Sequence, residues 1–129
     1  MVPEHLRYAP THEWCKLDGQ DIIIGVTAHA IASLGELIYV ELAEVDDDVL
    51  VEVPFGEIEG LRDLKDLISP ADGRVVEVNK RVVLSPELLV KDPYGEGWLI
   101  RLRRDAAVAL DNLLSAAAYE ALLRKRRSR

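Results

Sequence analysis

The chain has 129 residues, of which 49% are apolar and 30% are charged. This balance is typical of one folded domain and unlike that of a disordered chain. The net charge of −7 and the aromatic content of 5% argue against a nucleic-acid-binding protein, because such proteins neutralise phosphates with clustered cations.

The first part of the chain predicts a β-hairpin followed by a short helix. Residues 11–26 form the expected hairpin, because the Asp-Gly pair at 18–19 is a strong turn signal between two runs suited to strands. Thr27 is a suitable N-cap for a helix over 28–34, and Gly35 would end that helix.

The middle of the chain contains two clear strands and one ambiguous segment. Residues 37–42 (LIYVEL) are rich in β-branched and aromatic side chains and predict a strand, as do residues 74–79 (RVVEVN). Three aspartates at 46–48 indicate a solvated turn, because no calcium-loop pattern surrounds them. The leucines of residues 59–68 recur with a helical period, but this pattern alone does not distinguish a helix from strands.

The last third of the chain is predicted to change from strand to helix. A capped helical turn is expected at 85–89, where proline takes the first helical position. A loop rich in glycine and proline at 92–97 leads to a final strand at 98–102. The spacing of alanine and leucine indicates two short helical pieces, at 111–114 and 115–123. Together the elements predict a mainly β, open or barrel-like body with a helical C-terminus.

Cysteine content, hydropathy and motifs exclude further classes of protein. Cys15 is the only cysteine, which rules out an internal disulfide, and no metal site is expected. No segment approaches the roughly 18 consecutive apolar residues of a membrane span, and residues 1–8 lack the apolar core of a signal peptide. Motifs of P-loop, serine-hydrolase, zinc-protease and dinucleotide-binding sites are missing. We therefore expect a cytoplasmic protein with no membrane or nucleic-acid partner and no catalytic site of these types.

Several short segments match one family pattern in order and spacing from about residue 6 to residue 123. The matching strings are YAPTHEW (8–14), IGVTAHA (24–30), LGE (34–36), YVEL (39–42), SPADG (69–73), VVEVN (75–79), SPEL (85–88) and DPYGEGW (92–98). As a set they resemble the H protein of the glycine cleavage system, a small lipoyl-carrying domain.

The resemblance implies a mainly β fold, a barrel-sandwich hybrid of two small sheets like that of lipoyl and biotinyl carriers. Short helices flank the sheets, and the C-terminus is helical. One domain is expected over 1–123, with a basic C-terminal tail at 124–129. The resemblance also implies a β-hairpin over 59–68, so the helical period there is expected to mislead.

The family resemblance further implies a non-catalytic carrier of glycine catabolism, and a monomer. In the family, a lipoyl group on a hairpin lysine takes an aminomethyl group from the decarboxylating P protein. The arm presents this group to the T protein, and the L protein then reoxidises the dithiol. A flexible arm on a rigid hairpin delivers one dithiol to several active sites at high effective concentration.

The hairpin segment departs from the family at the lipoyl-attachment position. The family pattern Glu-Ser-Val-Lys-Ala corresponds to EGLRD at 59–63, so Arg62 stands where the lysine is expected. A guanidinium stays protonated and is not a usable acyl acceptor, which places lipoate as a cofactor in doubt. Lys65, three residues further on, is a possible displaced site, about 10 Å along a strand at about 3.3 Å per residue.

Three explanations of Arg62 remain open. The chain is a paralogue that lost lipoylation, or a variant carrier modified at Lys65 by a lipoate ligase, or it bears an engineered substitution. The second explanation has a precedent in lipoate-binding relatives of sulfur-oxidising, heterodisulfide-reductase-like systems. The additional differences at Gly60, Leu61 and Asp63 favour natural divergence. A regulatory scaffold that competes for the carrier's docking site on the partner enzymes is a further alternative.

Residues that line the arm-binding cleft in the family are retained. The resemblance assigns this role to Thr11, Glu13, His29 and Asp66, and the two carboxylates could pair with a protonated amine. Cys15 is expected to be a small buried apolar residue rather than a reactive thiol.

Overall fold

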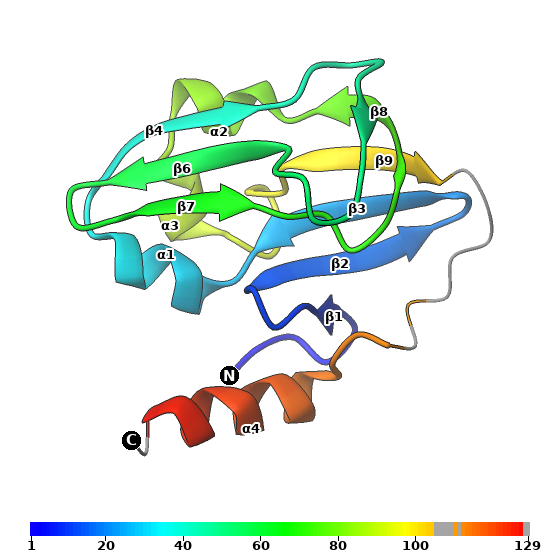
Figure 1. Cartoon of the computed structure of the whole chain (residues 1–129). Coiled ribbons are helices and arrows are strands. Elements are labelled where there is room, and N and C mark those ends of the chain that lie inside the picture. Colours follow the sequence, from blue (N-terminus) through cyan, green and yellow to red (C-terminus); the bar gives the residue numbers. More distant parts are fainter. Residues whose placement is uncertain (105–109, 111, 128–129) are drawn as a thin grey trace.

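Two antiparallel sheets build the protein, and the computed structural model describes residues 1–104, 110 and 112–127 (Figure 1). The larger sheet has the strand order β1 (Arg7–Tyr8), β2 (Glu13–Asp18), β3 (Asp21–Val26), β9 (Ile100–Arg104), β8 (Gly73–Val78) and β5 (Asp48–Val49). The smaller sheet has the order β4 (Leu37–Leu42), β6 (Gly56–Gly60) and β7 (Leu64–Leu67). The strands predicted at 37–42 and at 74–79 correspond to β4 and β8.

Short helices connect and flank these sheets: α1 (Ala28–Leu34), α2 (Lys80–Leu84), α3 (Leu88–Lys91) and α4 (Ala116–Arg127). The predicted caps of α1 are confirmed, since the Thr27 hydroxyl accepts a bond from the N–H of Ala30 and Gly35 ends the helix with φ 75°. Within the described ranges, no helix is both long and apolar enough to cross a membrane.

The C-terminal half differs from the sequence expectation in four places. Helix α2 was not predicted. A helical turn was expected at 85–89, but helix α3 begins only at Leu88. Residues 112–114 form a turn and a bridge rather than a helix, because Leu114 pairs with Tyr8 of β1; residue 111 lies outside the described part. The basic run expected as a tail at 124–129 begins inside α4, which continues to Arg127.

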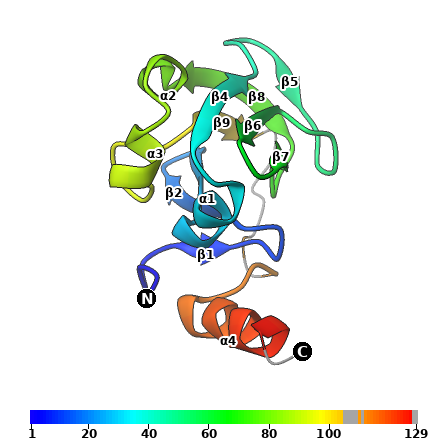
Figure 2. The same cartoon turned by 90° about the vertical axis from the view of Figure 1, so that its left-hand side faces the viewer.

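Alternating strand residues bury two separate apolar clusters. The main core lies between the sheets and includes Ile22, Ile24, Ile58, Leu67, Val75, Leu99, Ile100 and Leu102. A second cluster lies on the outer face of the larger sheet and includes Leu6, Tyr8, Trp14, Ile23, Ala116 and Tyr119. Helix α4 contributes to this second cluster and lies beside β1 (Figure 2).

The ambiguous segment 59–68 forms the β6–β7 hairpin, as the family resemblance implied. Ile58 and Leu67 are buried from the two strands, whereas Leu61 and Leu64 of the apparent helical pattern are exposed. The exposed leucines could not form the buried face of a helix, and β4 supplies β6 with a partner strand. Tertiary pairing therefore overrides the helical spacing here.

Candidate functional site

The tip of the β6–β7 hairpin carries Arg62 in an exposed position. The N–H of Gly60 donates to the carbonyl of Asp63 at 2.9 Å and closes the turn. The guanidinium of Arg62 makes no hydrogen bond or ion pair with any residue that the structure describes. The tip thus presents a permanently charged side chain to solvent.

The hairpin tip is fixed against the turn that follows α1. The N–H groups of Leu61 and Arg62 donate to the carbonyls of Glu36 and Leu34, at 2.8 and 2.9 Å. A Cβ on Gly60 would lie 2.1 Å from the Leu34 carbonyl oxygen, so a residue without a side chain is needed for this approach. The position of Arg62 relative to the body of the protein is therefore well defined.

Lys65 does not extend freely from the hairpin but reaches back to β2. Its ammonium lies 2.9 Å from the carboxylate of Glu13 and 2.6 Å from the carbonyl of Thr11. The side chain of Lys65 is 14% exposed and that of Glu13 is 1% exposed. The N–H of Ile68 donates to the same carboxylate at 3.1 Å, and the Thr11 hydroxyl donates to its other oxygen. Glu13 is thus fully partnered in a largely dry environment.

An open cleft of about 590 Å³ lies between the hairpin, α1 and the C-terminal helix. Thr11, His29 and Asp66 line it together with Lys65, whereas Glu13 lies buried beneath and does not line it. The structure therefore places three of the four residues that the resemblance assigned to an arm cleft in its wall, and the fourth, Glu13, beneath it in contact with Thr11 and Lys65. It also brings both candidate attachment positions close to it, Arg62 at the adjoining tip and Lys65 in its wall.

A hydrogen-bonded chain on the other side of the cleft was missed by sequence reasoning. The Nδ1 atom of His12 lies 2.7 Å from the Tyr119 hydroxyl, which lies 2.8 Å from the Thr27 hydroxyl. Arg126 donates to Nε2 of His12 at 3.2 Å, and the rings of His12 and His29 are 4.9 Å apart. Because Tyr119 and Arg126 lie on α4, more than 100 residues away from His12, no local sequence signal could reveal these contacts.

The electrostatics of this chain keep His12 neutral near pH 7. Burial lowers the pKa of His12 to about 4, and the charges of His29, Lys65 and Arg126 contribute in the same direction. Burial also raises the pKa of Tyr119 to about 12. A neutral imidazole can accept the Arg126 N–H at Nε2 while its Nδ1–H donates to the Tyr119 oxygen.

The described part of the chain adds neither a reactive thiol nor a metal site to this cleft. Cys15 is buried, and burial raises the pKa of its thiol to about 12, so the reactive thiolate is scarce. Among the described residues, no group of histidine, cysteine and carboxylate side chains could hold a metal ion.

Sequence comparison now places the chain among known proteins. The pattern of the family described as Glycine cleavage H-protein matches residues 6–126. The chain belongs to this family. The H protein of Symbiobacterium thermophilum is 44% identical over 124 residues, covering 96% of this chain and 97% of the relative. That of a Synechococcus strain is 42% identical over 121 residues, covering 94% of each chain.

A solved structure agrees with this family assignment. The crystal structure of a glycine cleavage system H protein from Mycobacterium marinum superposes with a TM-score of 0.84 and 35% sequence identity, covering 93% of this chain and 97% of that one. The expected barrel-sandwich hybrid fold of the H-protein family is thereby confirmed.

Proposed function

We propose that this H-protein family member is a non-catalytic protein that docks to the enzymes of a glycine-cleavage-like system without carrying a lipoyl arm. Its family membership supports the docking role, and the residues of the hairpin support the lack of an arm. We place the protein in the cytoplasm as a monomer.

The first support is the chemistry of the hairpin tip. The tip is exposed and fixed, as an attachment site requires, but its side chain is the guanidinium of Arg62. Amide formation with lipoate needs a neutral amine as the nucleophile, and arginine does not release its proton in proteins. The tip therefore offers no atom for acylation.

The observation that carries the proposal is the contact between Lys65 and Glu13. Acylation of Lys65 would remove its positive charge and pull its nitrogen away from a carboxylate that is 1% exposed. A buried carboxylate left without its cation is strongly unfavourable. The same contact places a cation of the protein's own where a protonated amine on an arm would meet Glu13. This argues against both a displaced arm at Lys65 and a carrier of the sulfur-oxidising type.

An intact-mass measurement tests the missing arm. The chain is produced together with a lipoate ligase and lipoate, and any added mass is located by peptide mapping. We expect no lipoyl group on the wild type and one lipoyl group on the Arg62→Lys variant, which restores an amine at the tip without changing the charge. A lipoyl group on Lys65 of the wild type would overturn the proposal and support a carrier with a displaced arm.

A competition assay tests the docking role and the regulatory alternative together. Without an arm, a chain that still docks would occupy partner enzymes unproductively, which is the regulatory scaffold's mode of action. We expect excess chain to slow glycine cleavage by a reconstituted system with a lipoylated H protein. An unchanged rate at a large excess would count against docking to these enzymes.

A further inference from the structure

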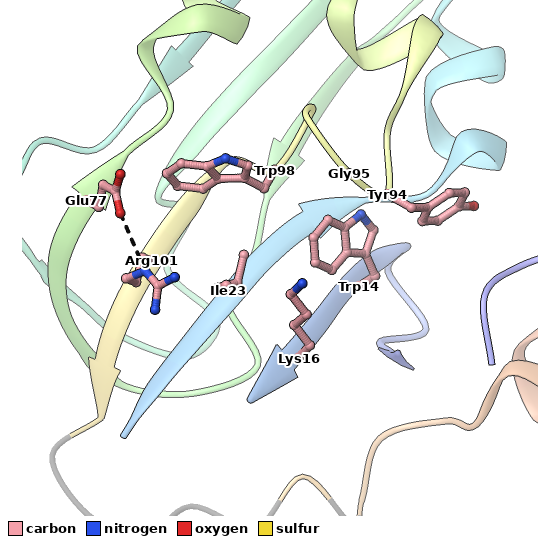
Figure 3. Close-up of a pocket in the computed structure, with 8 residues that line it drawn as sticks. All are labelled: Trp14, Lys16, Ile23, Glu77, Tyr94, Gly95, Trp98 and Arg101. Atoms are coloured by element: carbon pink, nitrogen blue, oxygen red, sulfur yellow. Dashed lines mark ion pairs between the residues drawn. The ribbon is translucent and has the colours of Figure 1, made fainter. Parts of the chain in front are cut away.

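A second pocket lies on the outer face of the larger sheet, and both tryptophans of the chain line it (Figure 3). It encloses about 280 Å³ and is lined by Trp14, Lys16, Ile23, Glu77, Tyr94, Gly95, Trp98 and Arg101. None of these residues lines the cleft beside the hairpin. Its volume is just below the usual range of ligand sites and suits a ligand of one or two rings.

The strand register sets the polar side of this pocket. Lys16 pairs with Ile23, Ile23 with Arg101, and Arg101 with Glu77, so these side chains form one row across four strands. Residues that are directly opposite in neighbouring strands project from the same face of a sheet. Along this row, the cation Lys16 lies on one side of the apolar Ile23. The cation Arg101 and the carboxylate of Glu77 lie on the other side.

The aromatic side of the pocket is held rigidly. The indole of Trp14 lies over Gly25, where a Cβ would come within 2.3 Å of its ring, and its N–H donates to the Pro93 carbonyl at 2.9 Å. The carbonyl of Trp98 accepts a bond of 2.6 Å from the side-chain amide of Asn79. Trp14 is buried and supports the pocket from below, whereas Trp98 is partly exposed and offers its ring to a planar ligand. An aromatic face that is in place before binding lowers the entropy lost on stacking.

The two cations of the pocket differ in whether they are already paired. The guanidinium of Arg101 lies 2.9 Å from Asp18, 3.3 Å from Asp21 and 3.5 Å from Glu77, so its charge is compensated. Lys16, in contrast, makes no hydrogen bond or ion pair within the described residues, although it is only partly exposed. An unpaired ammonium beside aromatic rings favours an anion.

We propose that this pocket binds a small aromatic carboxylic acid, with its ring against the partly exposed Trp98 and its carboxylate on the ammonium of Lys16. A neutral ring would leave Lys16 unpaired, and a cationic ring would be repelled by the ammonium of Lys16, since Arg101 and Glu77 already pair with one another. One ring, or two fused rings, fits the volume of the pocket, and the carboxylate of the ligand accepts a hydrogen bond from the Lys16 ammonium.

The indole N–H signals of the protein give a direct test of binding. The chain has two tryptophans, so its ¹H–¹⁵N spectrum contains two indole signals, and both report on this pocket. The probe is indole-3-carboxylate, compared with the neutral indole-3-carboxamide and the non-aromatic cyclohexanecarboxylate. We expect a saturable shift with the aromatic acid and about tenfold weaker binding of the amide, because a charge-assisted hydrogen bond is lost.

Matched lysine variants identify the anchor. Lys16→Gln should weaken binding of indole-3-carboxylate about tenfold, whereas Lys91→Gln, at an exposed lysine outside the pocket, should leave it unchanged. Indole signals at the wild-type positions before titration show that each variant is folded. Equal binding of acid and amide, equal binding by the two variants, or no saturable shift up to about 10 mM would overturn the proposal. None of these readouts depends on lipoylation, so the result is independent of the proposed function.

Discussion

The ammonium of Lys65 and the carboxylate of Glu13 form an ion pair of 2.9 Å between the β6–β7 hairpin and β2. The pair joins the smaller sheet to the larger one, and it is shielded from solvent on both sides. The stability of the fold is therefore expected to depend on Lys65, the one lysine of the hairpin.

Replacing Lys65 by methionine should lower the free energy of unfolding by about 2–3 kcal/mol, because the buried side chain of Glu13 would lose the cation that compensates its burial. Denaturant unfolding of the wild type and the variant measures the change. Lys91→Met is the matched control and should change stability by less than about 0.5 kcal/mol. The double variant Glu13→Gln/Lys65→Met should recover part of the loss; a single variant as stable as wild type would contradict the structural role of the pair.

The Tyr119 hydroxyl lies between His12 and Thr27 and fixes α4 to the cleft. Tyr119→Phe should reduce stability by about 1 kcal/mol, since the buried Thr27 hydroxyl and the partly buried His12 ring would each lose a partner. Tyr39→Phe removes a hydroxyl that contacts Glu57 at an exposed position and should have little effect. Thermal unfolding of the two variants side by side measures the difference, and equal melting temperatures would argue against the hydrogen-bonded chain.

The low pKa of His12 predicts a pH dependence of stability. Burial, followed by the effects of His29, Lys65 and Arg126, lowers the pKa of this imidazole to about 4 in the folded state, from its ordinary value of 6.5. Between these two values the unfolded chain binds more protons than the folded one. Stability from this group is therefore complete above about pH 6.5 and is lost as the pH falls toward 4.

A His12→Gln variant should accordingly show a shallower loss of melting temperature between pH 6.5 and 4.5 than the wild type. The difference between the two profiles removes the contribution of the carboxylates, which both proteins share. Parallel profiles would mean that His12 titrates normally in the folded protein.

The thiol of Cys15 should be unreactive in the native protein. It is buried, and its pKa is raised to about 12, so a disulfide reagent at pH 8 should label it only after the chain opens. The measurement is the rate of labelling with and without denaturant, and we expect full labelling only in denaturant. Rapid labelling of the native chain would show that β2 is accessible at this position.

Local sequence signals predicted those elements whose determinants lie within a few residues of one another. Thr27 and Gly35 define the ends of α1, and Gly19 of the predicted Asp-Gly signal begins the two-residue turn, Gly19 and Gln20, that joins β2 and β3. The family resemblance supplied the β6–β7 hairpin, which periodicity could not, because the strand pairing of β6 with β4 depends on residues about 20 positions away.

The candidate site divides in the same way. The sequence by itself determined the family, the arginine at position 62 and the retained carboxylate of Glu13, because these depend only on residue identity and register. Only the tertiary structure decided that Lys65 neutralises Glu13 and that α4 brings Tyr119 and Arg126 to His12. An ion pair or hydrogen bond depends on distances of about 3 Å, and such distances between residues far apart in the chain arise only when the sheets and helices pack.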